Sequence, residues 1–410
     1  MDSAEALRRL VEVVGSDAVL RHDPLELDGV GLDCTLRPAD GPALAVALQA
    51  LERLGLAAIV RGGASGLGLG NPPRRADLLL STERLSAIDE LDAGEGVCHA
   101  LAGTPLRELR RAVRAEGWEL PMDPPGEAAT LGGALAAAAV GPRAQAFGRP
   151  RDLVLGLEVA LPRGERARCG GRVVKNVTGY DLAKLYVGSC GTLGVIEGAW
   201  LRLRPRPESV RLLEARLADA GRACQEGVAA ARRPTARAAA LSLGADGEVS
   251  LAVELAGDAP SVGRDAAELA AGIGAEPCDA GLAPLRALQA EASGLRFRLA
   301  LLPSRLAAGL ARLRTAGARL LAYPGLGLVW ALFPLDGADA RADADRAWLA
   351  VASTARDAGG SFRLESAPLF AKRGRDVFGE ASPAWSLIGA LKQRFDPKGV
   401  LNPGRFAGGV

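Results

Sequence analysis

The segment from Gly188 to Gly194 constrains the fold of this 410-residue chain most narrowly, because glycine recurs in it at every third position. Glycine has no Cβ atom, so such a segment can turn sharply and bring its backbone amides close to a flat or anionic ligand. Helix-like spacing precedes the segment and an apolar stretch follows it. We predict a tight turn between a helix over Tyr180–Tyr186 and a strand over Val195–Leu203.

The first glycine-rich segment in chain order is the loop Arg61–Gly70, which follows a predicted apolar strand over Ala57–Val60. In the dinucleotide-binding fingerprint of Rossmann domains, the glycines run directly into a helix whose N-terminus holds the pyrophosphate. Here Asn71, Pro72 and Pro73 follow, and they cannot open a long helix, so we exclude that fingerprint. Two interpretations stay open: a loop whose successive amides wrap phosphates, and an ordinary surface loop.

The second segment in chain order lies between this loop and the turn at Gly188–Gly194, which is the third segment. It consists of Pro121–Pro125 followed by Thr130–Ala136. Thr130 is a favourable N-cap residue, so a helix is expected to begin there. The two glycines of its first turn leave the amide ends open to a ligand. The alanines that follow favour the alternative reading, a small-residue helix packed in the core.

In their order and approximate spacing, the three segments resemble the FAD-binding domain of the vanillyl-alcohol-oxidase type, also called the PCMH type. Within that family the chain is most similar to the FAD-binding E subunits of bacterial glycolate oxidases, over four segments: Gly141–Arg143, Phe147–Asp152, Lys175–Asp181 and Asp376–Phe406. The resemblance covers residues 36–203 and returns at the C-terminus. It is much weaker over residues 208–370.

The resemblance implies an α+β fold. A PCMH-type FAD-binding domain of two α+β subdomains is expected over residues 1–206, and an α+β cap domain for a substrate or a partner over residues 207–385. A C-terminal segment, residues 386–410, would return to the FAD domain. The segment Arg204–Pro207 marks the predicted linker, since alternating prolines stop both helices and sheets.

The resemblance also implies one FAD, held by residues of the three glycine segments and of the C-terminal motif. These residues are Arg61, Gly62, Gly63, Ala64, Ser65, Gly66, Pro121, Asp123, Thr130, Leu131, Gly132, Gly133, Gly188, Gly191, Thr192, Gly194, Val195, Ile196 and Asn402. Some relatives attach FAD covalently through a histidine in the first loop. Residues 61–70 contain no histidine, so we expect the FAD to be non-covalent.

The chain has two histidines, and neither is expected to be catalytic. His99 falls in a predicted strand and reads as structural, whereas His22 reads as solvated. Oxidation of a 2-hydroxy acid by a flavin needs a base for the hydroxyl proton, most often a histidine. A guanidinium can still bind the substrate carboxylate. Arg298 is the candidate catalytic residue and Tyr323 a weaker one; the alternative for Arg298 is an arginine exposed on one face of a strand.

By the resemblance, the chain is the FAD-binding subunit of a glycolate oxidase that oxidises glycolate to glyoxylate. Its partners would be a second FAD subunit and an iron–sulfur subunit. The six cysteines show no C-x-x-C spacing, so we expect no cluster or other metal site in this chain. Electrons would then leave through another chain or a soluble acceptor. The alternatives are a stand-alone FAD-dependent dehydrogenase of D-lactate or a similar 2-hydroxy acid, and a non-catalytic assembly subunit.

Charge and composition exclude some function classes. The 50 basic and 48 acidic residues nearly balance and aromatic residues make up 4%, which argues against a nucleic-acid surface. The start of the chain lacks the basic and apolar regions of a signal peptide, and the apolar runs are too short or broken to cross a bilayer. We expect a cytoplasmic protein without direct membrane insertion, which partner subunits could hold at the periphery of the inner membrane.

Lysine is rare in the chain: five lysines stand among the 50 basic residues. All five lie in or near the segments described above. We therefore hypothesise that arginine cannot replace lysine at these positions.

Overall fold

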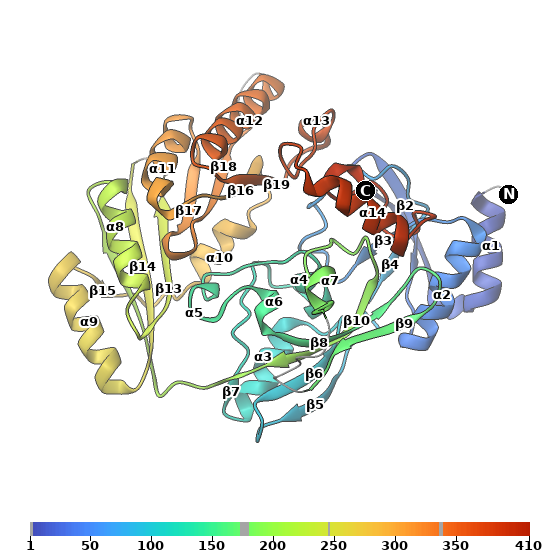
Figure 1. The fold of residues 1–410 in the computed structure, drawn as a ribbon, viewed down its shortest axis with the longest axis horizontal. Helices are drawn as coiled ribbons and strands as arrows, with labels where there is room; N and C mark the ends of the chain where they lie inside the picture. Colours follow the sequence, from blue (N-terminus) through green and yellow to red (C-terminus); the bar gives the residue numbers. More distant parts are fainter. Residues whose placement is uncertain (1–2, 173–179, 245–246, 336–338) are drawn as a thin grey trace.

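The computed structural model of the chain describes residues 3–172, 180–244, 247–335 and 339–410. Its helices and strands are mixed along the chain, and Figure 1 shows three bodies: a small sheet with the N-terminal helices, a central sheet, and a larger sheet backed by helices. The predicted α+β fold is confirmed. The motif residues Lys175–Gly179 lie outside the described residues.

The N-terminal body is a four-stranded sheet with two helices beside it. Its strand order is β1–β2–β4–β3, with β1 and β2 antiparallel and the other pairs parallel: β1 Val19–Leu27, β2 Val30–Leu36, β3 Ala58–Arg61, β4 Leu78–Ser81. Helices α1 (Ser3–Val14) and α2 (Gly41–Leu54) pack on each other. Asp40 caps α2 by accepting a hydrogen bond of 2.8 Å from the amide of Ala43. The first glycine loop leaves this body at the end of β3.

The central body is an antiparallel sheet of five strands in the order β5–β6–β10–β8–β9: β5 Ile88–Asp92, β6 Val97–Leu101, β8 Val154–Ala160, β9 Arg166–Gly170, β10 Val195–Arg202. Several helices lie beside it, most of them short: α3 Leu106–Ala115, α4 Leu131–Ala136, α5 Ala144–Phe147, α6 Pro150–Leu153, α7 Ala183–Tyr186. Thr130 caps α4 as predicted, because its hydroxyl accepts from the amide of Gly133 at 3.4 Å. The second and third glycine segments belong to this body.

The third body is an eight-stranded sheet in the order β15–β12–β14–β13–β17–β18–β16–β19: β12 Ser209–Arg216, β13 Ala236–Leu243, β14 Val249–Gly257, β15 Glu276–Pro277, β16 Leu295–Ala300, β17 Arg319–Tyr323, β18 Leu328–Phe333, β19 Ser361–Ser366. One face packs on four helices: α8 Ala220–Ala231, α9 Ala259–Ile273, α11 Leu306–Thr315, α12 Ala340–Asp357. The other face packs on α5, on Val140 and on α10 (Ala283–Ala290), and so faces the other two bodies.

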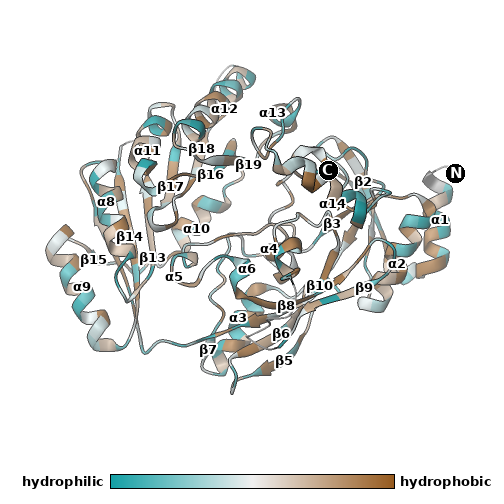
Figure 2. Ribbon diagram, in the orientation of Figure 1, coloured by the Kyte–Doolittle hydropathy of each residue, from teal (hydrophilic) through white to brown (hydrophobic). Residues whose placement is uncertain are grey.

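Hydropathy follows this layering. In Figure 2 the strands β6 and β8 are largely hydrophobic, while the outer helix α9 alternates between hydrophilic and hydrophobic stretches. One face of α9 is buried through Val262, Ala266 and Leu269, as expected for an amphipathic helix on a sheet. Within the described ranges, no helix is both long and apolar enough to span a bilayer.

The C-terminal residues return to the N-terminal body. After α13 (Leu369–Lys372) and α14 (Ala384–Phe395), Leu401 forms a parallel bridge with Ala58 of β3. The amide of Ala58 donates to the carbonyl of Val400 at 2.7 Å, and the amide of Asn402 donates to the carbonyl of Ala58 at 2.9 Å. The division into residues 1–206, 207–385 and 386–410 stays a prediction.

Two local predictions were wrong. The helix expected over Tyr180–Tyr186 is only the single turn α7, because Tyr180 is 96% exposed and no apolar face forms before Ala183. The proline-rich linker does not exclude sheet structure: Arg204–Pro205 forms the short strand β11, which pairs with β7 (Trp118–Glu119). A proline at the edge of a two-stranded ladder loses no hydrogen bond, which explains why it is tolerated.

Of the four lysines that lie in the described ranges, two are buried and make contacts that suit an ammonium group. Lys392 donates to Asp396 at 2.6 Å, to the carbonyl of Thr192 at 2.8 Å and to that of Leu401 at 2.7 Å. Lys372 donates to both carboxylate oxygens of Asp28 and to a loop carbonyl. Three acceptors around one nitrogen fit a compact ammonium, whereas a guanidinium is planar and larger. These contacts give a reason for lysine at two of the five positions.

We predict that Lys392→Arg lowers the free energy of unfolding by about 2 kcal/mol, because the larger group overpacks a buried site and loses part of its hydrogen bonding. Lys398→Arg is the matched control, since Lys398 is exposed and makes one bond of 3.5 Å. That control should stay within about 0.5 kcal/mol of the parent protein. Urea unfolding of the two variants is the measurement, and equal stability of both would contradict the packing argument.

Candidate functional site

The three glycine segments meet in the fold. The hydroxyl of Thr130 lies 3.4 Å from the amide of Gly63 and also 3.4 Å from that of Gly133, which joins the first loop to the start of α4. The amide of Cys190 in the third segment donates to the carbonyl of Ala136 at 2.9 Å, which joins the turn to the end of α4. Segments separated by more than 50 residues along the sequence therefore form one surface.

Several of the glycines are required by packing rather than by a ligand. A Cβ atom on Gly62 would lie 2.1 Å from the hydroxyl of Thr130, and one on Gly63 would lie 1.6 Å from the carbonyl oxygen of Ala128. Gly66 differs, because a Cβ atom there would meet only the Cβ of Ala137, at 3.7 Å. The space beside Gly66 is thus open to a ligand.

The bends of two loops carry residues in the left-handed region. Ala64 has φ 61° and Cys190 has φ 53°, values that residues with a side chain adopt rarely. The amides of Ala64, Ser65 and Gly66 donate no hydrogen bond to the described residues. Successive free amides in such a bend form a concave site for an anion.

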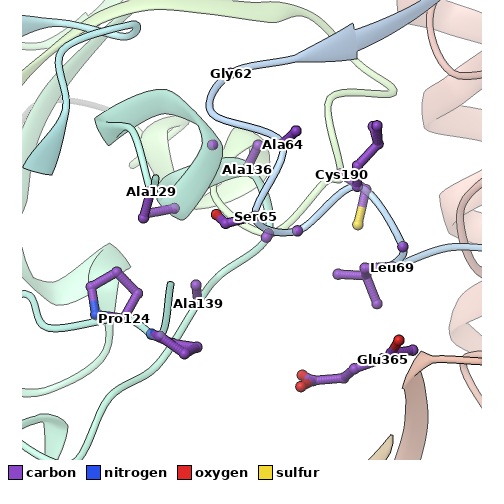
Figure 3. Close-up of a pocket in the computed structure, with 18 of the residues that line it drawn as sticks. Gly62, Ala64, Ser65, Leu69, Pro124, Ala129, Ala136, Ala139, Cys190 and Glu365 are labelled. Carbon is purple, nitrogen blue, oxygen red and sulfur yellow. The ribbon is translucent and has the colours of Figure 1, made fainter. Parts of the chain in front are cut away.

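A cavity of about 330 Å³ lies between this surface and the eight-stranded sheet. Figure 3 shows Ala64, Ser65 and Cys190 on the side of the glycine loops, with Glu365 reaching in from the strand opposite. A smaller cavity of about 60 Å³ adjoins the first, and the two share lining residues: Val60, Arg61, Gly62, Gly133, Ala136, Cys190 and Asn402. The pair forms an extended site of the size expected for a cofactor or small-molecule pocket.

Charged residues on neighbouring strands form the wall opposite the glycine loops. Arg298 on β16 is in register with Trp330 on β18 and with Arg363 on β19. Arg363 donates to Glu365 at 2.6 Å, and the indole nitrogen of Trp330 donates to Glu365 at 3.0 Å. Arg296, two residues before Arg298 on the same strand, lies 3.6 Å from Glu365. Three guanidinium groups therefore surround one carboxylate, which leaves the wall cationic.

Burial and the neighbouring charges both shift the pKa values of this wall. Burial, followed by the nearby charge of Arg363, lowers the pKa of Arg298 to about 9. Although burial raises the pKa of Glu365, the guanidinium groups of Arg363, Arg298 and Arg296 lower it to about 2. At neutral pH Arg298 and Glu365 are therefore both charged. With the guanidinium groups of Arg296 and Arg363, the wall holds a net positive charge where water is scarce. An anion that enters the cavity would offset this cost.

Arg298 therefore lines the cavity, and the interpretation of an exposed strand arginine was wrong: its side chain is 20% exposed. Tyr323 is fully buried, lines none of the cavities described, and donates its hydroxyl to Gln289 at 2.9 Å. The charged wall was only partly predicted, since Arg363 and Glu365 were missed. The alternation of charged with apolar residues in both strands was the available signal.

Most residues that the resemblance assigned to FAD line one of the two cavities: Arg61, Gly62, Gly63, Ala64, Ser65, Gly66, Gly132, Gly133, Gly191, Gly194, Val195, Ile196 and Asn402. Others stand behind this lining: Pro121, Asp123, Thr130, Leu131, Gly188 and Thr192. Asp123 is buried, and burial raises the pKa of its carboxyl to about 7. Pro124 and Pro125, which were not assigned, line the larger cavity in its place.

The histidines lie away from the cavities. Nδ1 of His99 on β6 is 3.1 Å from a carboxylate oxygen of Asp89, in keeping with a structural role. His22 is half-buried rather than fully solvated, since its Nε2 is 2.9 Å from the hydroxyl of Thr35. Among the described residues, no group of three or more His, Cys, Asp or Glu side chains could hold a metal ion.

Lys372 and Arg405, both paired with Asp28, fix residues 67–69 of the first glycine loop. Asp28 accepts from Lys372 at 2.8 and 2.9 Å and from Arg405 at 3.1 Å. Lys372 also donates to the carbonyl of Gly68 at 2.8 Å, and Arg405 donates to the carbonyls of Leu67 and Leu69, each at 2.6 Å. With its carbonyls held from behind, the loop keeps the cavity-facing residues 64–66 in place.

Comparison with known proteins agrees with this geometry. A family model described as an FAD binding domain matches residues 32–170. The chain is 34% identical to D-lactate dehydrogenase of Archaeoglobus fulgidus over 217 residues, which are 52% of this chain and 49% of that protein. It is 40% identical to the glycolate oxidase subunit GlcE of Escherichia coli over 153 residues, which are 37% of this chain and 43% of that protein. The chain thus spans less than half the length of these curated relatives.

Solved structures match over nearly the whole chain. Substrate-bound p-cresol methylhydroxylase has a TM-score of 0.75 at 15% identity, and the match covers 98% of this chain and 96% of that one. Alkyldihydroxyacetonephosphate synthase has a TM-score of 0.72 at 14% identity, covering 98% of this chain and 85% of that one. At such identities the likeness concerns the fold. The family match identifies an FAD-binding domain within residues 32–170, with FAD as its cofactor.

Proposed function

We propose that the chain oxidises a small 2-hydroxy acid, with glycolate as the favoured substrate, as the FAD-binding subunit of a glycolate oxidase complex. The observation that carries the proposal is the cationic wall of Arg296, Arg298 and Arg363, which faces the glycine loops across one cavity. A 2-hydroxy acid has a carboxylate for this wall. Relatives named as glycolate oxidase subunits and as D-2-hydroxyglutarate dehydrogenase support the substrate class.

The residues present fit FAD. In the proposal, the free amides of residues 64–66 hold its pyrophosphate, and the small side chains at Ala136 and Ala137 leave room for a planar ring system. Asn402 and the turn at Gly191 line the second cavity, which would take another part of the dinucleotide. When bound, FAD supplies a hydride acceptor.

The substrate carboxylate is assigned to Arg298, with Arg363 beside it. The guanidinium group of Arg298 makes no hydrogen bond to the described residues. Its nearest charged partner is the carboxylate of Glu365, at 3.6 Å. Arg363 is already held by Glu365 and by the carbonyl of Ala137, so its guanidinium is fixed in direction. Arg298 therefore has donors left for the ligand, and Arg363 adds positive charge at a defined place.

The hydroxyl proton has no evident acceptor in the described lining. Glu365 is a weak base at a pKa of about 2, and burial raises the pKa of the Cys190 thiol, which keeps it protonated. This favours a subunit that works with a second flavoprotein and an iron–sulfur subunit over a stand-alone dehydrogenase. The preformed cavity argues against a non-catalytic assembly subunit. Cytoplasmic location, with contact to the inner membrane only through partners, belongs to the same proposal.

We predict that Gly66→Val weakens FAD binding by about tenfold or more, because its side chain would project into the cavity, where a Cβ atom makes only an ordinary contact with the Cβ of Ala137 at 3.7 Å. The measurement is titration of the apoprotein with FAD, followed by flavin fluorescence. Gly263→Val is the matched control, since a Cβ atom at Gly263 meets nothing within 4 Å on helix α9, remote from the cavity. An unchanged FAD affinity in Gly66→Val would place the cofactor elsewhere.

A second prediction concerns the carboxylate site. Arg298→Ala should weaken glycolate binding to the FAD-loaded protein by about tenfold to a hundredfold, the usual loss for a charged hydrogen bond. Perturbation of the flavin spectrum by glycolate measures this binding even if turnover is slow. Arg305→Ala, which removes an exposed arginine outside the cavity, should bind as the parent does. Equal affinity in both variants would refute the assignment of Arg298.

A third prediction separates subunit from stand-alone enzyme. Purified alone, the chain should bind FAD and glycolate but reduce a dye acceptor slowly, because the lining lacks a base. Purified from its native cell, it should carry a second flavin chain and an iron–sulfur chain, with much faster turnover. Full activity of the isolated chain towards glycolate or D-lactate would instead support the stand-alone dehydrogenase.

A further inference from the structure

A third cavity, of about 300 Å³, has no part in the proposed function. It adjoins the cavity of about 330 Å³ that the proposal assigns to FAD, here called the flavin cavity. Helix α3 lines it on one side, α10 on another, and the loop at residues 124–129 separates it from the flavin cavity. The two cavities share Pro124, Ala129 and Ala290 as lining residues. A ligand in this cavity would lie directly behind the wall of the cofactor site.

The charged lining of this cavity is strongly unbalanced. Arg107 and Arg110 project from α3 and Arg286 from α10, while Glu127 is the one carboxylate in the described lining. Arg110 is partly satisfied, since its Nε and a terminal nitrogen donate to the carbonyl of Met122 at 2.9 and 2.6 Å. The described residues offer the side chains of Arg107 and Arg286 no hydrogen bond or ion pair.

Several arginines elsewhere in the described chain have acidic partners. Arg143, for example, pairs with Glu254 at 2.8 Å, and Arg166 pairs with Glu197 at 2.7 Å. Around the third cavity the nearest buried acid is Asp123, which interacts with Arg110 and Arg286, but burial raises its pKa to about 7. Asp123 therefore offsets only part of their charge at neutral pH. Unpaired guanidinium groups around an open space are the arrangement that binds oxyanions.

The backbone adds to the same field. The N-terminal residue of α10, Ala283, lines the cavity, and no side chain caps that end of the helix. The helix dipole places partial positive charge there, which favours an anion. Burial also lowers the pKa of Arg110, so its charge is held at a cost that an anion would reduce.

We propose that this cavity is a binding site for a small oxyanion, a carboxylate or a phosphate, held by Arg107, Arg110 and Arg286 next to the cofactor site. The site is distinct from the carboxylate position at Arg298, and its existence does not depend on which acid the flavin oxidises. The loop at residues 124–129 and Ala290 of α10 line both this cavity and the flavin cavity.

The test is site-resolved modification of arginine in the FAD-loaded full chain. Phenylglyoxal modification is followed by peptide mass spectrometry, alone and with succinate or inorganic phosphate as the probe. Both anions should slow modification of Arg107 and Arg286, and the stronger of the two identifies the preferred source of the oxyanion. Arg111, exposed on the same helix but outside the lining, is the internal control and should react at an unchanged rate.

Two variants make the result specific. Arg286→Ala should raise the anion concentration that half-protects Arg107 by about tenfold. Arg107→Ala changes an exposed residue, so it should leave folding intact and weaken the protection of Arg286 in the same way. Failure of both anions to protect either arginine, or equal protection of Arg111, would overturn the proposal. Because Arg298 is mapped on a different peptide, loss of the proposed substrate site would be seen separately.

Discussion

The contacts of Asn402 are the constraint on which the cofactor site depends. Its side-chain oxygen accepts from the amide of Val60 at 2.8 Å, across 342 positions of sequence, and its nitrogen donates to the carbonyl of Cys190 at 2.7 Å. One amide group thus joins the strand before the first glycine loop to the third glycine turn. A carboxylate or an aliphatic side chain could not both accept and donate there. The cavity beside the glycine loops therefore depends on the return of the C-terminal segment to β3.

The two walls of the cavity act by different electrostatic means. The glycine loops offer backbone amides, which are dipoles and need no counter-charge, whereas the strand wall offers full charges that burial makes costly. Arg363 connects the walls, since it donates to the carbonyl of Ala137 at 3.4 Å while it holds Glu365 at 2.6 Å. The eight-stranded sheet is thereby fixed against the glycine loops. The charge that faces the cavity keeps its position without a ligand.

The sequence predicted what is local. Glycine spacing marked the three loops, Thr130 marked the start of α4, and the order of the motifs indicated the α+β fold. It missed Arg363 and Glu365, because their place in the site depends on β19 lying next to β16, a pairing across more than 60 residues that no local pattern specifies. Its assignment of Asp123 to the cofactor stays a prediction, since Asp123 is buried and lines neither of the two cavities.

The rigidity of the first loop follows from what surrounds it. Ala64 at φ 61° stores strain of about 1–3 kcal/mol, which a free loop would release by changing conformation. Lys372 and Arg405 prevent that change, because they hold three successive loop carbonyls and are themselves fixed by Asp28. Ordering the loop is then a cost of folding rather than of binding. Since residues 64–66 already line the cavity with free amides, the binding energy of a ligand need not be spent on arranging the loop.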